Sequence, residues 1–316
     1  MEKIHILSPA TIANLSCGFD VLGACTNIIC EEMIIHKVTT KGIKITHITG
    51  AILPLETEKN VAGMAAQSIY NLYKEQVDFG FEIEIHKKVK IGSGIGSSAA
   101  SAAAAVFGIN YFLGNPLSKK ELVYHAMIGE AIASGSQHAD NVAAAILGNF
   151  TLIRSYNPLD IIEIPSPKEL YTVILHPHVE VKTSEARAVL KPTVPLKNAI
   201  IQWGNLGGLI AGLYTNNYQL IGNSLTDVII EPYRKELIPY FEETVSIARQ
   251  TGALGAGISG SGPSIFALAK GEINAQKIAE EMKNYYQKTG ISFTVYFSKI
   301  NNEGVKLKTT KENAIL

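Results

Sequence analysis

The chain has 316 residues, with 28 lysines and arginines against 28 aspartates and glutamates, and therefore no formal net charge at pH 7. Its length allows two domains, or one large domain, with a sizeable buried core. Proteins that bind nucleic acids or membrane surfaces usually carry a clustered basic excess, and this composition predicts neither kind of partner.

In chain order, the first half alternates predicted strands and helices. Strands are predicted at residues 4–7, 28–38 and 81–91, the last from the period of two in Phe81, Ile83 and Ile85. Helices are predicted at residues 60–76, 97–112, 118–134 and 142–147. Ser118 followed by Glu121 is a capping-box pattern and predicts the start of the third of these helices.

In the second half, strands are predicted at residues 149–154, 170–176, 264–269 and 292–298. Helices are predicted at residues 198–216, 218–227, 237–251 and 274–289. A polar, proline-marked stretch near residues 155–165 predicts a boundary, which divides the chain into domains 1–160 and 161–316. Strands and helices without a regular βαβ rhythm indicate an α+β fold.

Three cysteines, Cys17, Cys25 and Cys30, lie close together without CxxC spacing. An odd number of cysteines in such a pattern is typical of free thiols in a reducing compartment. The first residues lack a basic region followed by a long apolar stretch, and no segment approaches the length of a membrane-spanning helix. We therefore expect a cytoplasmic protein without membrane contact.

A glycine-rich segment, KIGSGIGSSAAS at residues 90–101, follows one predicted strand and begins a predicted helix. Backbone N–H groups of such a turn and the positive end of the helix dipole favour a phosphate. The segment is neither a Walker A loop nor a GxGxxG fingerprint. The glycines alone fit a tight turn as well as a phosphate site, and the serines and alanines that follow favour the phosphate site.

Two further segments stand out, SPATIANLSCGFDVLG at residues 8–23 and GALGAGISGSGPS at residues 252–264. Taken alone, the first fits an ordinary loop in which Asn14 or Asp20 caps a turn. The second, with five glycines in its first eleven residues, fits a flexible hairpin loop as well as a phosphate-lining backbone.

Residues 91–101 resemble the nucleotide-binding motif of the GHMP kinases, and the other two segments resemble the first and third motifs of that superfamily, in the same order. Residues 8–23 are similar to its homoserine-kinase form. Lys90 and Cys17 stand where the family ordinarily has proline. The resemblance implies a two-domain fold, with an N-terminal domain like the second domain of ribosomal protein S5 and a ferredoxin-like C-terminal domain.

The resemblance also implies ATP as phosphate donor. The residues that it assigns to ATP binding are Lys90, Ile91, Gly92, Ser93, Gly94, Ile95, Gly96, Ser97, Ser98, Ala99, Ala100, Ser101, Gly257 and Gly260.

Glu130 lies among small apolar residues of a predicted helix, where an unpaired carboxylate is costly. It therefore fits a magnesium ligand, because Mg²⁺ takes oxygen ligands and bridges nucleotide phosphates; a solvent-facing helix residue is the alternative. The family resemblance places Glu130 and Ser98 at the metal. Asp140 fits a helix N-cap on sequence alone. By resemblance it is a general base or a group that positions the acceptor, and His138 is a pocket residue.

Asn14 and Asp20 would hold the polar end of the acceptor by resemblance, with Asp20 suited to an ammonium group. Arg187 and Arg234, each a surface residue when taken alone, lie in strings similar to homoserine-kinase signatures. Two arginine forks for a carboxylate, with Asp20 opposite, describe a site for an α-amino acid.

The resemblance thus implies phosphorylation of the side-chain hydroxyl of L-homoserine to O-phospho-L-homoserine in threonine biosynthesis, and it implies a homodimer. Two other functions stay open at this point. One is a GHMP kinase for mevalonate or a sugar, and the other is a catalytically inactive ligand-binding protein with the same fold.

Overall fold

The computed structural model describes residues 2–134 and 138–309 of the chain. Its first sheet has seven strands in the described part of the chain, in the order β11-β1-β2-β4-β3, with β5 on β2 and β6 on β5. These strands are β1 (Lys3–Ala13), β2 (Leu22–Val38), β3 (Ile43–Thr49), β4 (Gly80–Lys87), β5 (Phe150–Tyr156), β6 (Leu159–Ile164) and β11 (Lys306–Leu307). β3 and β4 pair parallel, and the other pairs are antiparallel.

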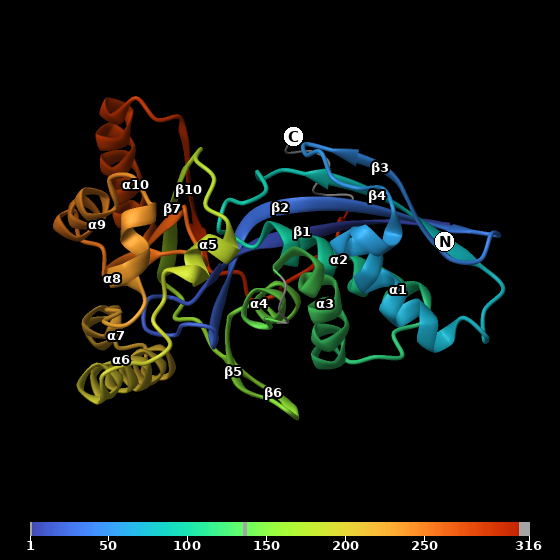
Figure 1. Ribbon diagram of the computed structural model, residues 1–316, viewed down its shortest axis with the longest axis horizontal. Coiled ribbons are helices and arrows are strands. Elements are labelled where there is room, and N and C mark those ends of the chain that lie inside the picture. The colour runs from blue at the N-terminus through green and yellow to red at the C-terminus, as the bar shows by residue number, and fades with distance from the viewer. Residues whose placement is uncertain (1, 135–137, 310–316) are drawn as a thin grey trace.

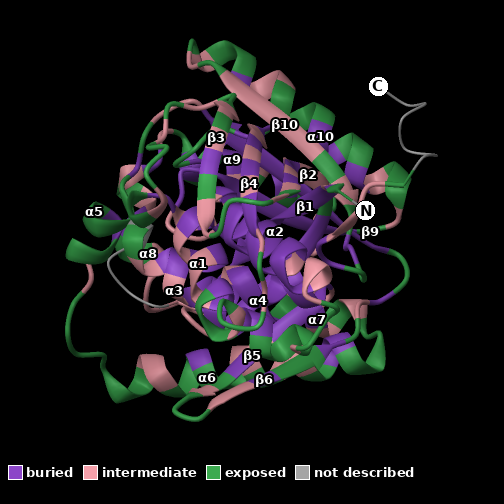
Figure 2. Ribbon diagram, turned by 90° about the vertical axis from the view of Figure 1, so that its right-hand side faces the viewer, coloured by how far each residue is buried: buried purple, intermediate pink, exposed green. Residues whose placement is uncertain are grey.

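Four helices cover one face of this sheet (Figure 1). They are α1 (Val61–Tyr73), α2 (Ser97–Phe112), α3 (Lys119–Ser134) and α4 (Asp140–Leu147). Their alanine-rich faces pack on apolar strand residues such as Ile35, Ile83 and Ile85, all fully buried. Burying this much apolar surface is the main favourable contribution to folding here. Figure 2 shows the buried core between these layers.

A second, four-stranded antiparallel sheet has the order β10-β7-β9-β8. Its strands are β7 (Leu170–Pro177), β8 (Gly255–Ile258), β9 (Ile265–Lys270) and β10 (Phe293–Lys299). The helices of this half are α5 (Thr183–Ala188), α6 (Leu196–Thr215), α7 (Tyr218–Ser224), α8 (Glu231–Arg234), α9 (Phe241–Gln250) and α10 (Glu272–Tyr286). Short 3-10 turns occur at η1 (Thr57–Lys59), η2 (Lys235–Leu237) and η3 (Gln287–Thr289).

The two sheets share a core, which fixes one half of the molecule against the other. Ile12 and Leu22 from the first sheet pack in one cluster with Ile174 and Phe266 from the second. On the other side of the second sheet, α9 and α10 contribute to a separate cluster. A rigid junction of this kind lets segments from both halves line a common site.

The α+β expectation is confirmed, and several predicted boundaries are wrong. The strand predicted at 81–91 ends at Lys87, three residues before the glycine-rich segment at residues 90–101. The helix predicted from residue 237 begins only at Phe241, after Pro239. The helix predicted to reach residue 227 ends at Ser224. Asp227 instead accepts hydrogen bonds from the backbone N–H groups of residues 229–231 at the start of α8.

Several short elements were not predicted: β3, β6, β8, β11, α5 and α8. β8 has the sequence GAGI and so resembles a turn, because glycine weakens a strand pattern. The domain division at residue 160 stays a prediction; in the structure β6 still pairs with β5 of the first sheet, and β11 returns to that sheet. No helix in residues 2–134 and 138–309 has the length and apolar character needed to cross a bilayer.

Candidate active site

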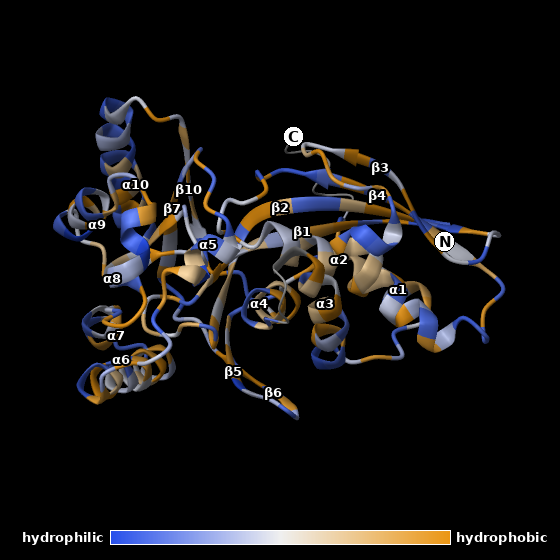
Figure 3. Cartoon of the chain, in the orientation of Figure 1, coloured by the Kyte–Doolittle hydropathy of each residue, from blue (hydrophilic) through white to orange (hydrophobic). Residues whose placement is uncertain are grey.

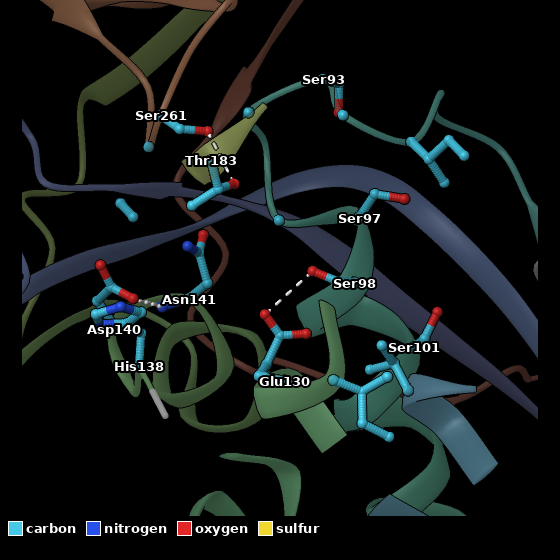
Figure 4. Close-up of a pocket in the computed structure, with 18 of the residues that line it drawn as sticks. Ser93, Ser97, Ser98, Ser101, Glu130, His138, Asp140, Asn141, Thr183 and Ser261 are labelled. Carbon is cyan, nitrogen blue, oxygen red and sulfur yellow. Dashed lines mark hydrogen bonds between the residues drawn. The ribbon is translucent and has the colours of Figure 1, made fainter. Parts of the chain in front are cut away.

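A cavity of about 410 Å³ lies between the two halves and is lined by both. Its lining includes Ala13, Asn14, Asp20, Leu53, Pro54, Lys59, Asn60, Val61, Lys87, Ile91, Gly92, Ser93, Gly94, Gly96, Ser97, Ser98, Ser101, Glu130, Ile132, His138, Asp140, Asn141, Val181, Thr183, Arg187, Arg234, Gly260 and Ser261. Figure 4 shows how ten of these side chains surround the space. A concave site of this size, with convergent polar groups, suits a small-molecule ligand.

The predicted phosphate loop forms one wall of the cavity. Gly94 has φ +77°, and a Cβ there would lie 2.5 Å from the carbonyl oxygen of Gly262. Gly96 is the N-cap of α2, with φ +71°, and a Cβ there would lie 2.0 Å from Thr11 Oγ1. Only glycine tolerates both the conformation and the close approach. The start of α2 thus presents its backbone N–H groups at the cavity, the arrangement that binds phosphate.

The three motifs interlock through hydrogen bonds. Ser259 Oγ donates to the Gly94 carbonyl at 2.7 Å, and Ser264 Oγ donates to the Ser93 carbonyl at 2.5 Å. Asn14 Nδ2 donates to the Gly260 carbonyl at 2.7 Å. The third motif is therefore a brace between the phosphate loop and the first motif rather than a flexible hairpin.

The first motif is strained at the cavity. Asn14, Leu15 and Ser16 have φ values of 71°, 46° and 60°, and Asp20 has φ 60°. Left-handed backbone at non-glycine residues costs on the order of 1–3 kcal/mol each and is concentrated at functional sites. The backbone N–H of Asp20 donates to Asn14 Oδ1 at 3.0 Å, which fixes the carboxylate relative to the motif.

Ser98 and Glu130 meet at the N-terminal end of α2. Ser98 Oγ donates to Glu130 Oε2 at 3.1 Å, as Figure 4 shows. Burial raises the pKa of Glu130 to about 7, against the lowering effect of the Ser98 hydrogen bond. Within the described residues no three His, Cys, Asp or Glu side chains converge to hold a metal ion. Two adjacent oxygen donors beside a phosphate site fit Mg²⁺, which takes its remaining ligands from phosphates and water.

Asp140 is the first residue of α4 and is almost fully buried. The N-cap interpretation is wrong: Ala139 is the N-cap, and Asp140 Oδ1 instead accepts a hydrogen bond from the backbone N–H of Asn141 at 2.8 Å. Burial and, to a smaller extent, the Asp20 carboxylate raise the pKa of Asp140 to about 7, against the lowering effects of the Asn141 hydrogen bond and of Arg187. Such a carboxyl group is able to accept a proton near neutral pH.

Asp20 and Arg187 form a bidentate ion pair at the cavity wall. Arg187 Nη1 lies 3.1 Å from Asp20 Oδ2, and Arg187 Nη2 lies 3.0 Å from Asp20 Oδ1. His138 Nε2 lies 3.1 Å from Arg187 Nη2. Burial lowers the pKa of His138, so the ring is neutral near pH 7 and Nε2 is able to accept from Arg187. Residues 135–137, which precede this histidine in the predicted connection, lie outside the described residues.

Arg234, from α8, lies beside this pair and is 3% exposed. Its Nε donates to the Ala186 carbonyl at 2.8 Å, and its Nη1 donates to the Gly260 carbonyl at 3.1 Å. The guanidinium groups of both arginines lie over the ring of Phe19, at 4.9 and 5.4 Å. Burial and Arg187 lower the pKa of Arg234 to about 10. Because two guanidinium groups lie close together here, an anionic ligand beside them would be stabilised.

Not every residue predicted for ATP binding lines the cavity. Those that do not are Lys90, Ile95, Ala99, Ala100 and Gly257. Ile95, Ala99 and Ala100 are fully buried behind the loop, in the hydrophobic core. Lys90 is exposed. Burial and, to a smaller extent, His178 and the charge of Lys90 lower the pKa of His176. Gly257 lies in β8, where a Cβ would lie 2.6 Å from both Ser16 Oγ and Glu231 Oε2. Their role toward ATP stays a prediction.

A buried ion pair beneath the phosphate loop was not predicted. Lys87 Nζ lies 2.6 Å from Glu31 Oε2, and it donates to the Ser97 carbonyl at 2.6 Å and to Ser101 Oγ at 2.5 Å. Glu31 and Lys87 are directly opposite each other on β2 and β4. The signal was in the sequence: Lys87 continues the inward-facing period of Phe81, Ile83 and Ile85.

A second contact that the sequence did not indicate lies in the lining of the cavity. Thr183 Oγ1, at the start of α5, lies 3.4 Å from Ser261 Oγ of the third motif (Figure 4). It joins the segment that carries Arg187 to the segment next to the phosphate loop.

Comparisons with known proteins agree with this geometry. The family models described as GHMP kinases N terminal domain and GHMP kinases C terminal match residues 60–149 and 209–288. A homoserine kinase of Chlorobium phaeobacteroides is 44% identical over 97% of this chain and 100% of its own length. A crystal structure of homoserine kinase from Cytophaga hutchinsonii is 46% identical, with a TM-score of 0.93 over 98% of both chains. The chain belongs to the GHMP kinases, in their homoserine kinase branch.

This membership confirms the two-domain GHMP fold expected from the motifs. A mevalonate kinase structure from L. major, 17% identical with a TM-score of 0.69, shares the fold alone. GHMP kinases use ATP as phosphate donor, and the loop at the start of α2 supplies the backbone geometry for its phosphates. Of the two positions where the family ordinarily has proline, Lys90 is exposed and Cys17 is buried in the shared core.

Proposed function

We propose that this chain transfers the γ-phosphoryl group of Mg·ATP to the side-chain hydroxyl of L-homoserine, giving ADP and O-phospho-L-homoserine. The observation that carries the proposal is the pair of opposite charges Asp20 and Arg187, with Arg234 beside it, in the same cavity as the phosphate loop. The ammonium group of a bound α-amino acid is able to pair with Asp20, and its carboxylate is able to pair with Arg187 and Arg234.

The acceptor would replace the Asp20–Arg187 contacts with its own. Its α-ammonium group would lie against Asp20, and its α-carboxylate against Arg187 and the outer edge of the Arg234 guanidinium. Arginine binds a carboxylate through two parallel N–H donors, which fixes orientation as well as affinity. Asn14 supports this end of the site by holding the Asp20 backbone, and His138 supports it by holding Arg187.

The phosphate loop would hold the triphosphate of ATP through the backbone N–H groups of residues 92–98. This arrangement supplies positioning and charge stabilisation, which are the main sources of catalysis in phosphoryl transfer. Ser98 and Glu130 would hold Mg²⁺, which, when bound, neutralises charge on the phosphate oxygens. Glu130 is buried beside the loop and accepts a hydrogen bond from Ser98. The two oxygen ligands would therefore be in place before ATP binds.

Asp140 would accept the proton of the acceptor hydroxyl. The hydroxyl oxygen forms a bond to the γ-phosphorus while the bond from that phosphorus to the β,γ-bridging oxygen breaks, and the electron pair leaves on ADP. A raised pKa near 7 makes this carboxylate a stronger base than an ordinary aspartate. The alternative role, in which Asp140 only positions the acceptor, is separated from this one by a pH profile described below.

The proposal includes the setting expected for this reaction: a step of threonine biosynthesis in the cytoplasm, carried out by a homodimer. It is tested by a coupled ADP-release assay with Mg·ATP and four acceptors, L-homoserine, mevalonate, galactose and L-serine, with the product identified by ³¹P NMR. We expect turnover with L-homoserine and at most slow turnover with the others. Turnover with mevalonate or galactose instead would overturn the amino-acid assignment, and ATP binding without any turnover would indicate an inactive ligand-binding protein.

A further inference from the structure

The outward face of α6 is apolar. This helix of 20 residues contains one charged residue, Lys197. Its inward face carries the buried residues Gln202, Leu209 and Leu213. A surface helix ordinarily places charged and polar residues opposite its buried face. Here the opposite face carries large apolar side chains, although α6 lies at the margin of the molecule, beneath α7 (Figures 1 and 3).

The outward residues form a regular seam. They follow one another at spacings of four and three residues in turn, the spacing of a coiled-coil contact: Leu196, Ile200, Trp203, Gly207, Ile210 and Tyr214. Leu196 is 68% exposed, Ile200 is 55% exposed and Trp203 is 60% exposed. A seam of this kind is typical of a helix that packs against another helix. Near its C-terminal end Ile210 packs partly against the shared core, and the Tyr214 hydroxyl donates to the Glu163 carbonyl at 3.3 Å. The exposed side chains of Leu196, Ile200 and Trp203 are left open by the part of the chain that the structure describes.

Packing against the described residues does not require glycine at two positions on this face, Gly204 and Gly207. Gly208 and Gly212 pack closely against Ser224 and Ile221 of α7. At Gly204 and Gly207, in contrast, a Cβ would meet no atom of the described residues within 4 Å. A glycine inside a helix destabilises it by about 1 kcal/mol relative to alanine. Open glycines next to an exposed tryptophan make a shallow recess that a partner helix is able to enter.

We propose that this face of α6, the α6 seam, packs antiparallel against the α6 seam of a second copy of the chain, around a two-fold axis near residue 205. With this register Trp203 lies over Gly207 of the partner subunit. Ile200 then faces Ile210 of the partner subunit, and Leu196 faces Tyr214 of the partner subunit. The largest side chain of the seam therefore meets its smallest residue, and the seam is complementary to itself.

Charge and area favour a second copy over an unrelated partner. Across a two-fold axis the same surface supplies both sides of the contact, so a charge near the axis would lie close to its own copy, and the six seam residues carry no charge. With about 200 Å² for a large apolar side chain, the exposed parts of Leu196, Ile200, Ile201, Trp203 and Tyr214 come to roughly 550 Å² per copy. Stable interfaces bury about 800 Å² per partner, and flanking residues such as Val194 supply the rest.

The α6 seam is separate from the cavity, whose lining contains no residue of α6. The inference specifies a surface for the dimer included in the proposed function, and its test needs no substrate. Loss of the dimer and loss of kinase activity are therefore measured independently.

The test compares molar masses by sedimentation equilibrium for the wild type, Ile200→Glu and a matched control, Ile273→Glu. Ile273, on α10, is 84% exposed and lies outside the seam. We expect the wild type and Ile273→Glu at twice the chain mass of 34.1 kDa, and Ile200→Glu with a dissociation constant raised at least tenfold. A monomeric wild type, or an Ile200→Glu dimer as tight as wild type, would overturn the proposal, as would equal weakening by both variants.

Trp203 provides a second readout because it is the only tryptophan of the chain. Its emission should shift to longer wavelength when the wild type is diluted to the monomer, and should stay shifted in Ile200→Glu at every concentration. Gly207→Leu should raise the thermal stability of the monomer, since leucine favours a helix, and at the same time weaken the dimer. A Gly207→Leu variant with an unchanged or tighter dimer would contradict the register of Trp203 over this glycine.

Discussion

The guanidinium of Arg187 holds both carboxylate oxygens of Asp20, although 167 residues separate the two in the chain. Asp20 was predicted to bind the ammonium group of an amino-acid acceptor, and Arg187 its carboxylate. In the structure the two side chains bind each other instead. Arg187 is 41% exposed as a side chain and Asp20 29%, so solvent screens the pair and its separation costs little. The pair keeps both groups oriented until an acceptor with both charges replaces it.

Replacing Arg187 by alanine should weaken acceptor binding. We expect kcat/KM for L-homoserine to fall about 100-fold or more, roughly 2.7 kcal/mol, because a bidentate charge-assisted contact is lost. The KM for ATP should change little. Arg154→Ala is the matched control, since Arg154 pairs with Asp160 at the surface, outside the cavity. Equal losses in the two variants, or a change confined to ATP, would contradict the acceptor role.

Replacing Asp140 by asparagine tests the base. Since the pKa of Asp140 in the chain without acceptor is raised to about 7, kcat/KM of the wild type for L-homoserine at saturating Mg·ATP should fall as the pH falls below about 7. Asp140→Asn should lower kcat by about 10²–10⁴-fold and remove this acidic limb. A variant with nearly unchanged kcat, a raised KM for L-homoserine and the acidic limb intact would assign Asp140 a positioning role instead.

Glu130→Gln should stabilise the free protein at alkaline pH. Burial raises the pKa of Glu130 from 4.5 to about 7, so the folded state binds a proton that the unfolded state releases between these values. The stability of the wild type should therefore fall as the pH rises from about 4.5 to 7, by up to roughly 3 kcal/mol. Thermal melts without nucleotide should show Glu130→Gln above wild type at pH 8 and equal to it near pH 4.5.

The same variant should lose Mg²⁺ affinity, seen as a higher Mg²⁺ concentration for half-maximal rate. A Glu130→Gln protein with wild-type Mg²⁺ dependence would contradict the ligand role of this carboxylate, whatever its melting temperature.

Removing one member of the buried Glu31–Lys87 pair should lower the free energy of unfolding more than removing both members together. Lys87→Met leaves Glu31 buried and uncompensated, and we expect a loss of about 3–5 kcal/mol in the free energy of unfolding. Glu31→Leu with Lys87→Met should recover most of that loss. Urea denaturation of the two single variants and the double variant gives the coupling energy; additive losses would show that the two side chains do not depend on each other.

Gly94→Ala should destabilise the protein more than backbone strain alone explains. Gly290 has the same φ of +77°, but a Cβ there would meet no described atom within 4 Å, so Gly290→Ala measures the strain alone. Gly94→Ala adds a clash with the Gly262 carbonyl and should separate the phosphate loop from the third motif. We expect a lower melting temperature than for Gly290→Ala and a raised KM for ATP. Equal melting temperatures would contradict the bracing of the loop.

Much of the fold was predictable because it depends on local patterns. The capping box of Ser118 and Glu121 forms as expected, with the Ser118 N–H 2.7 Å from Glu121 Oε2. Helix α2 occupies the predicted residues 97–112, as its alanines and the preceding glycine turn indicate. Strand β1 was predicted only at residues 4–7, because the first motif resembles a loop in sequence. In the structure it continues to Ala13 through a register shift at Pro9.

The site was less predictable where its contacts depend on packing between segments that are far apart in the chain. Family motifs indicated which residues converge, and Asn14, Asp20, His138, Arg187 and Arg234 do line one cavity. Sequence patterns cannot show that Arg187 pairs with Asp20 or that Arg234 uses two donors on backbone carbonyls. These contacts join α5, α8, the first motif and the third motif, which are far apart in the chain. Asp140 was misassigned as a cap because helix α4 begins two residues before the predicted start.

The most direct test of the account compares L-homoserine with two acceptors that each lack one charge, 4-hydroxybutanoate and 3-aminopropan-1-ol, in the Mg·ATP assay. The account predicts a loss of kcat/KM with either truncated acceptor, and it predicts that Arg187→Ala further impairs 3-aminopropan-1-ol far less than it impairs L-homoserine, because that acceptor has no carboxylate to lose. If both truncated acceptors react as well as L-homoserine, recognition by Asp20 and Arg187 is contradicted.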